Sequence, residues 1–134
     1  MKVTEAITFA DSLKPNAFTE EQKLVWLNEL EGRIQSLIHN VKPEELMKYT
    51  LPDDEETAMI VPAPYDNVYW KWLCAMIDYA NGEYDKYTNA QIVANDAYLD
   101  YAKWVVRTGH ELPKKEEAIP DDPDEGLEGV LPGE

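Results

Sequence analysis

A run of aromatic residues between Val61 and Thr108 constrains the fold of this chain more than any other feature. The run holds the only cysteine, Cys74, and most of the large rings in the 134 residues. It contains seven of the eight tyrosines and three of the four tryptophans: Tyr65, Tyr69, Trp70, Trp72, Tyr79, Tyr84, Tyr87, Tyr98, Tyr101 and Trp104. Because large rings dominate the apolar area that a core buries, the core is expected to form mainly from this segment.

The first half of the run is expected to form a helix that begins near Asp66. A carboxylate at that position is a good N-cap, since it accepts from the free amides of the first helical turn. Apolar residues then recur at the spacing of one helical face, at Tyr69, Leu73, Met76, Ile77 and Ala80. The pair Asn81-Gly82 predicts the end of this helix, because both residues tolerate the left-handed conformation that ends helices.

The second half of the run predicts a longer helix over residues 83–108, about 40 Å in length. Its apolar face is expected to consist of Tyr87, Ala90, Ala94, Ala97, Tyr98, Tyr101, Ala102 and Val105. Alanines in the middle of that face permit close approach of a partner helix, and Gly109 supplies the stop. One alternative stays open, in which a single helix continues through Gly82 with a kink.

The first 60 residues add two shorter helices. One is expected from Thr4, as its cap, to Leu13. The other runs from Thr19 to Ile38 and opens on the capping box Thr19-Glu20-Glu21-Gln22. Its apolar face is expected to comprise Leu27, Leu30, Ile34, Leu37 and Ile38, with Trp26 beside it. Residues 41–59 have no clear periodicity, and 59–61 suits a short strand or an extended tie onto the helices. The fold class is therefore all-α, a small bundle of about four helices with a long C-terminal helix.

The last residues differ in composition from the rest. Residues 111–134 contain four of the nine prolines, three of the six glycines, nine acids and two lysines, which gives 2 − 9 = −7 of the net charge of −15. Such a composition is typical of disordered segments. We therefore expect one helical domain over residues 1–110 and an acidic, Pro/Gly-rich flexible tail over residues 111–134.

No pattern for catalysis, cofactor binding or metal binding stands out. The two histidines, His39 and His110, each adjoin a predicted helix end, where a cation is favoured, so both are expected to be structural caps. Cys74 lies among apolar residues and is expected to be a buried free thiol. The acidic run 121–126 lacks the ligand order of a calcium loop. The expectation is a non-enzymatic protein with no cofactor and no membrane segment, whose charge opposes binding to the outside of DNA.

The aromatic residues are the strongest functional signal. A small bundle cannot bury all of them, and exposed tyrosine and tryptophan are enriched where proteins bind one another. Two interpretations stay open: the rings fill a thin core, or some of them contact other subunits or partners. The candidate contact residues are Tyr65, Tyr69, Trp72, Tyr84, Tyr87, Asn89, Asn95, Tyr98, Tyr101 and Trp104.

These residues also carry a family resemblance. The pattern comprises Val61, Pro62, Pro64, Tyr65, Asp66, Tyr69, Leu73, Ala75, Ile77, Asp78, Tyr79, Ala80, Asn81, Gly82, Glu83, Tyr84, Tyr87, Asn89, Asn95, Ala97, Tyr98, Tyr101, Ala102 and Trp104, preceded by Leu13-Lys14-Pro15-Asn16 and by Trp26, Leu27 and Leu30. Over residues 3–107 the chain resembles small helical proteins encoded in prophages beside the portal and capsid genes, the head–tail connector or head-completion adaptor family of tailed bacteriophages.

The resemblance implies a structural virion protein. Such a protein is made in the cytoplasm of the host bacterium and sits at the head–tail junction of the virion. It would form a ring, dodecameric by analogy, below the portal protein, contact the next head-completion or tail protein, and let DNA pass through the lumen without specific binding. The acidic charge leaves one alternative, a phage inhibitor that mimics DNA and binds a host nucleic-acid-binding protein.

Overall fold

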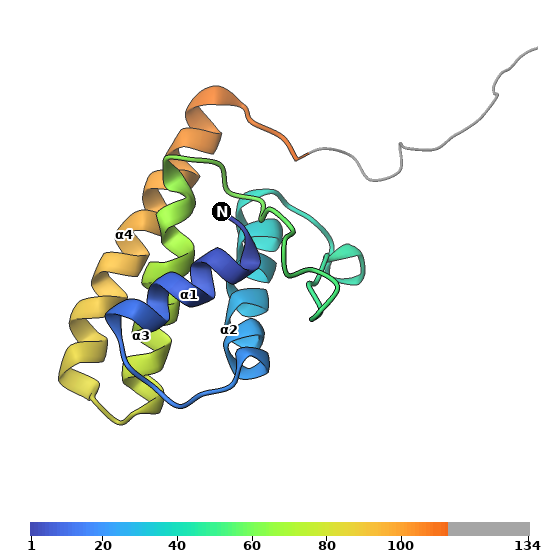
Figure 1. The fold of residues 1–134 in the computed structure, drawn as a ribbon. Coiled ribbons are helices and arrows are strands. Elements are labelled where there is room, and N and C mark those ends of the chain that lie inside the picture. Colours follow the sequence, from blue (N-terminus) through green and yellow to red (C-terminus); the bar gives the residue numbers. More distant parts are fainter. Residues whose placement is uncertain (113–134) are drawn as a thin grey trace, which may run out of the picture.

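A computed structural model of the chain describes residues 1–112, and these form an all-α fold (Figure 1). Its elements are α1 (Val3–Leu13), α2 (Glu20–Arg33), the π-helical turn η1 (Ile34–Ile38), the 3₁₀ turns η2 (Pro43–Glu45) and η3 (Tyr65–Asn67), α3 (Val68–Ala80) and α4 (Tyr84–Thr108). The predicted fold class, with four main helices and a long C-terminal one, is confirmed. The expected flexible tail lies almost wholly outside the described residues.

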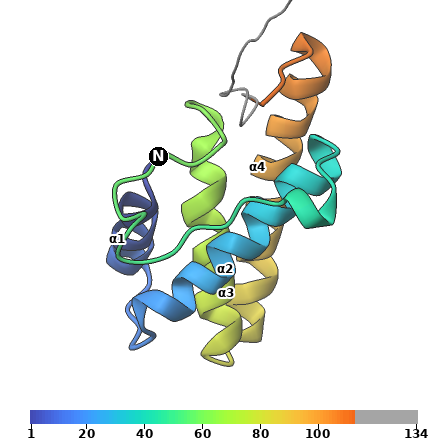
Figure 2. The same ribbon diagram turned by 90° about the vertical axis from the view of Figure 1, so that its right-hand side faces the viewer.

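Helix α3 is the centre of the bundle. It pairs with α4 as a hairpin and also contacts α1 and α2. Figure 1 shows α1 crossing α3, and Figure 2 shows α2 lying across α3 between α1 and α4. Since α3 touches three partners, its mainly apolar sequence is buried on several sides, as expected for a helix without a continuous polar face.

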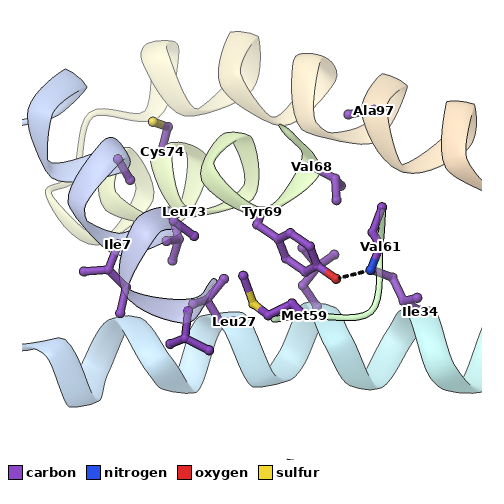
Figure 3. Close-up of a cluster of buried hydrophobic side chains, with 14 of the residues drawn as sticks. Ile7, Leu27, Ile34, Met59, Val61, Val68, Tyr69, Leu73, Cys74 and Ala97 are labelled. Atoms are coloured by element: carbon purple, nitrogen blue, oxygen red, sulfur yellow. Dashed lines mark hydrogen bonds between the residues drawn. The ribbon is translucent and has the colours of Figure 1, made fainter. Parts of the chain in front are cut away.

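The segment before α3 closes the core on one side (Figure 3). Met59 and Val61 are buried among side chains from the helices, including Leu27, Ile34 and Leu73. The backbone amide of Val61 donates to the Tyr69 hydroxyl at 2.8 Å. This is the extended tie that the sequence suggested, and its pairing is limited to an isolated bridge between Lys2 and Ala58.

The helix ends agree with the capping signals in part. Thr19 and Gln22 form the predicted capping box, and Gly82 and Gly109 have positive φ values of 75° and 68°. The hairpin turn at Gly82 excludes the single kinked helix. Two predicted caps are wrong. Helix α1 begins at Val3, and the Thr4 hydroxyl donates to the carbonyl of Glu55.

Asp66 is the second wrong cap. It lies inside the 3₁₀ turn η3, and its carboxylate pairs with the amino group of Met1 at 3.2 Å. Helix α3 starts two residues later, because that turn changes the direction of the chain first. At the other end of the same helix, Ala80 is exposed rather than buried, since it lies where α3 leaves the bundle.

The predicted helix over residues 19–38 changes geometry at Ile34. Five residues adopt a π-helical turn, in which the amide of His39 bonds to the carbonyl of Ile34. A π turn holds more residues than an α turn, so side chains after it rotate around the axis. Leu37, expected in the core, is 65% exposed as a result. Among residues 1–112, no helix combines the length and apolarity that crossing a membrane requires.

Candidate interaction surface

The ten candidate contact residues fall in separate parts of the fold. Trp72, Asn95 and Tyr98 line a groove between α2 and α4. Tyr84 and Tyr87 lie at the α3–α4 turn, and Tyr65, Tyr101 and Trp104 belong to an aromatic cluster at the other end of α4. Asn89 is exposed on α4, and Tyr69 is in the core.

Burial removes two of these residues from any contact surface of the folded chain. Tyr69 and Tyr101 are completely buried, and both hydroxyl groups are hydrogen-bonded inside the protein. They had been grouped with the others by residue type, but a ring of this size fills a core as well as an interface. We therefore reassign both to the core.

The groove is built from three helices. Leu30, Arg33 and Leu37 form the wall from α2 and η1. Trp72 of α3 also lines the groove, and its indole N–H donates to the carbonyl of Trp26 at 2.8 Å, which fixes the ring. The opposite wall comes from α4 and consists of Gln91, Ala94, Asn95 and Tyr98. The Arg33 guanidinium lies 5.8 Å from the centre of the Trp72 ring.

The size of the groove limits what it can hold. Its volume is about 120 Å³. Pockets for small molecules usually measure about 300–1,000 Å³, so this groove is too small for a cofactor of ordinary size. A lining of apolar, aromatic and cationic side chains fits a single large side chain presented by another protein surface.

An exposed apolar stripe on α4 extends from the groove. Ile92, Leu99 and Val106 are 56%, 42% and 83% exposed, and they repeat every seven residues, so they lie along one side of the helix. Asn95 in the groove wall is three residues after Ile92 and four before Leu99, which places it beside both. Together the stripe and the groove give α4 an apolar face without a partner within residues 1–112.

The α3–α4 turn carries a second exposed cluster, which we call the tyrosine tip (Tyr79, Tyr84 and Tyr87). The ring of Tyr79 lies 5.7 Å from that of Tyr84 and 5.1 Å from that of Tyr87. Tyr79 and Tyr84 are more than half exposed. Backbone hydrogen bonds from Asn81, Gly82 and Glu83 to α3 hold the turn, so the rings are presented on a firm support.

The opposite end of α4 holds the two histidines. His39 Nε2 lies 2.7 Å from the Tyr101 hydroxyl, and the His39 and His110 rings are 6.2 Å apart. The His110 ring lies 4.8 Å from Trp104. Burial and, secondarily, His110 lower the pKa of His39 below its ordinary value of 6.5, which favours a neutral ring. His39 is the C-cap residue of η1, as predicted, whereas Gly109 caps α4 and His110 follows it. The two rings also belong to one aromatic cluster.

A buried carboxyl group, missed by sequence reasoning, joins α2 to α3. Glu31 is fully buried and accepts hydrogen bonds from Tyr49 Oη at 2.5 Å, Tyr69 Oη at 2.7 Å and the Ile60 amide at 2.9 Å. Burial raises the pKa of Glu31 above its ordinary value of 4.5, and the three hydrogen bonds oppose that rise without cancelling it. All three donors are satisfied internally, so this carboxyl group is structural.

Glu31 predicts a specific pH dependence. Because the folded state holds the proton of Glu31 more tightly than the unfolded state, its contribution to stability falls as pH rises above 4.5 through the folded-state pKa. We expect the stability of the wild type, measured relative to Glu31→Gln, to decrease as the pH rises above about 4.5. Urea unfolding of both proteins across that range measures the difference. Parallel curves would show that the carboxyl group titrates alike in both states.

The Cys74 thiol and the metal-binding side chains are two further candidates for a site within residues 1–112. Cys74 is buried and free, as predicted, and burial raises the pKa of its thiol to about 11. Within residues 1–112, no three side chains of the metal-binding types gather closely enough to hold an ion. Comparison of the chain with protein-family models, curated proteins and solved structures finds no match in any of the three.

Five of the eight groove residues and all three stripe residues were absent from the candidate set. Arg33 is one charge among many in the sequence, and Leu37 fitted the apolar face of its helix until the π turn displaced it. Ile92 and Leu99 did give a signal, because with Val106 they repeat every seven residues. That repeat shows a second apolar side on a helix whose first side already fills the core.

Proposed function

We propose that the protein is a structural component of a tailed-phage virion, a head–tail connector that assembles as a ring below the portal protein. The observation that carries the proposal is the unpartnered apolar face of α4, formed by the stripe and the adjoining groove. Exposed apolar side chains that gather beside a groove are a feature of protein–protein contact surfaces. The resemblance of residues 3–107 to the connector family supplies the type of assembly.

The charge of the chain suits this role. A net charge of −15 keeps the surface from adhering to DNA, which a connector has to let pass through its lumen. The same charge permits a DNA mimic, but mimicry requires a charged surface and gives no role to the exposed apolar stripe on α4. The exposed face therefore favours a ring contacting itself, the portal and the next head-completion or tail protein.

The proposal predicts that polar substitutions in the stripe impair assembly and spare the monomer. We expect the double variant Ile92→Gln/Leu99→Gln to reduce ring formation at least about tenfold, because each change places a polar amide where an apolar side chain would be buried in the subunit contact. Both side chains are already exposed in the monomer, so its free energy of unfolding is expected to change by less than about 0.5 kcal/mol per site. Light scattering of the full chain, alone and with its cognate portal protein, measures assembly, and urea unfolding measures stability.

A matched control is available on α2. Val25 is also exposed and apolar, but it is not part of the groove or the stripe. Val25→Gln is expected to assemble like the wild type. A wild-type protein that stays monomeric and does not bind the portal would overturn the connector proposal, and competition with DNA for basic host proteins would then support the mimic.

A further inference from the structure

We propose that the tyrosine tip of one copy of this chain inserts into the groove between α2 and α4 of a neighbouring copy. This inference rests on the proposed ring and names the contact that would build it. The partner is therefore a second copy of the chain. Three observations support that choice: the size of the groove, its charge, and the position of the tip.

The first observation is a match of size and chemistry. The groove, at about 120 Å³, accepts one large side chain and is too narrow for a helix. Tyr84 is the most exposed ring of the tip, at 61%, and it contacts the ring of Tyr79. A tyrosine entering between Trp72 and Tyr98 buries its apolar ring against two others, and its hydroxyl reaches the polar edge at Asn95 or solvent.

The second observation is charge complementarity. Arg33 lies on the groove over Trp72, and within residues 1–112 it has no carboxylate partner. The tip carries Glu83 and Asp85 on either side of Tyr84, and both are exposed. Glu83 has only a loose pair with Lys86, at 3.6 Å. In a chain of net charge −15, an arginine that has no carboxylate partner within residues 1–112 and lies beside an apolar groove attracts an acidic tip from another copy.

The third observation is that the contact cannot form within one chain. Tyr84 and Asn95 lie on the same straight helix, eleven residues and about 16 Å apart, so a tip cannot reach its own groove. The tip and the groove are also different surfaces. A contact between two different surfaces is head-to-tail, and its repetition closes a ring when the rotation permits.

Reversing the charge on each side tests the contact. We expect Arg33→Glu alone and Glu83→Arg/Asp85→Arg alone each to weaken assembly at least about tenfold, because like charges then face each other. In a 1:1 mixture, the acidic tip of the Arg33→Glu variant faces Arg33 of the other variant, and the arginine tip of that variant faces the new glutamate at position 33. Opposite charges then meet at every contact, so the mixture is expected to assemble with the two variants alternating. The triple variant, which combines all three changes, is expected to assemble by itself.

The readout is light scattering of the full chain, alone and with the portal protein, with urea unfolding to confirm that each variant folds. Arg107→Glu is the matched control, since Arg107 is the other arginine of the chain and is outside the groove. Tyr84→Ala is a charge-independent test and is expected to weaken assembly similarly. Variants that assemble like the wild type, or a mixture that fails to recover, would overturn this contact while the wild-type ring still supports the connector. Failure of the wild type to assemble or bind the portal would overturn both.

Discussion

Glu31→Ala is expected to destabilise the protein by about 3 kcal/mol or more at neutral pH. The substitution leaves two buried donors, the Tyr49 and Tyr69 hydroxyls, and the partly buried Ile60 amide without their acceptor. Each unsatisfied buried group costs about 1–3 kcal/mol, and the lost side-chain volume adds a cavity. For a domain of ordinary stability, about 5–15 kcal/mol, this is a large share of the total. The free energy of unfolding in urea is the measurement.

Two further variants separate the hydrogen bonds from the change in size and charge. Glu31→Gln keeps the shape but turns one acceptor into a donor. Because the Tyr69 hydroxyl already accepts from the Val61 amide, its proton then has no acceptor, and we expect a cost of about 1–3 kcal/mol. Glu29→Ala, at an exposed glutamate of the same helix, is expected to change stability by less than about 0.5 kcal/mol. A Glu31→Ala protein as stable as Glu29→Ala would contradict a structural role for the buried carboxyl group.

The cluster around Glu31 explains part of what the sequence could not predict. A glutamate in the middle of α2 is typical of a solvated helix position, and Tyr49 lies in a segment without periodicity. Their contact joins residues 18 positions apart, and the contact with Tyr69 joins residues 38 positions apart. Capping and periodicity report on neighbours within one helix, so they predicted α2 and α3 but not the polar group that fixes the loop between them.

The same limit applies to the candidate surface. The spacing along α4 revealed its buried face, with Ala94, Ala97 and Val105, because a repeat of three and four residues is a local signal. The groove needs the relative placement of α2, α3 and α4, which no single helix encodes. Trp72, Asn95 and Tyr98 were chosen from residue type, and the fold brings these three together. The same choice included Tyr69 and Tyr101, because residue type alone does not distinguish a core ring from a surface ring.

Lys14, in the Lys-Pro-Asn segment after α1, forms an ion pair with a buried carboxylate of α3. Lys14 Nζ lies 3.0 Å from Asp78 Oδ2, and Asp78 is only 1% exposed. Neither carboxylate oxygen has a well-aligned hydrogen bond within residues 1–112, so the Lys14 ammonium is the group that offsets the buried charge. The backbone carbonyl of Asp78 also accepts from the Glu83 amide at the α3–α4 turn. This ion pair therefore ties α1 to the helix end that supports the tyrosine tip.

Lys14→Met is expected to destabilise the protein by about 3–5 kcal/mol, because it removes the partner of a buried carboxylate and leaves the charge uncompensated. In an Asp78→Asn background the same change is expected to cost less than about 1 kcal/mol, since the buried charge is already gone. Lys86→Met, which removes the exposed Lys86–Glu83 pair, is expected to cost less than about 0.5 kcal/mol. Urea unfolding of the four proteins of the Lys14–Asp78 cycle gives the coupling energy. A Lys14→Met cost that is equal in both backgrounds would mean that the lysine acts through its aliphatic packing, and the buried carboxylate of Asp78 would then need another source of compensation.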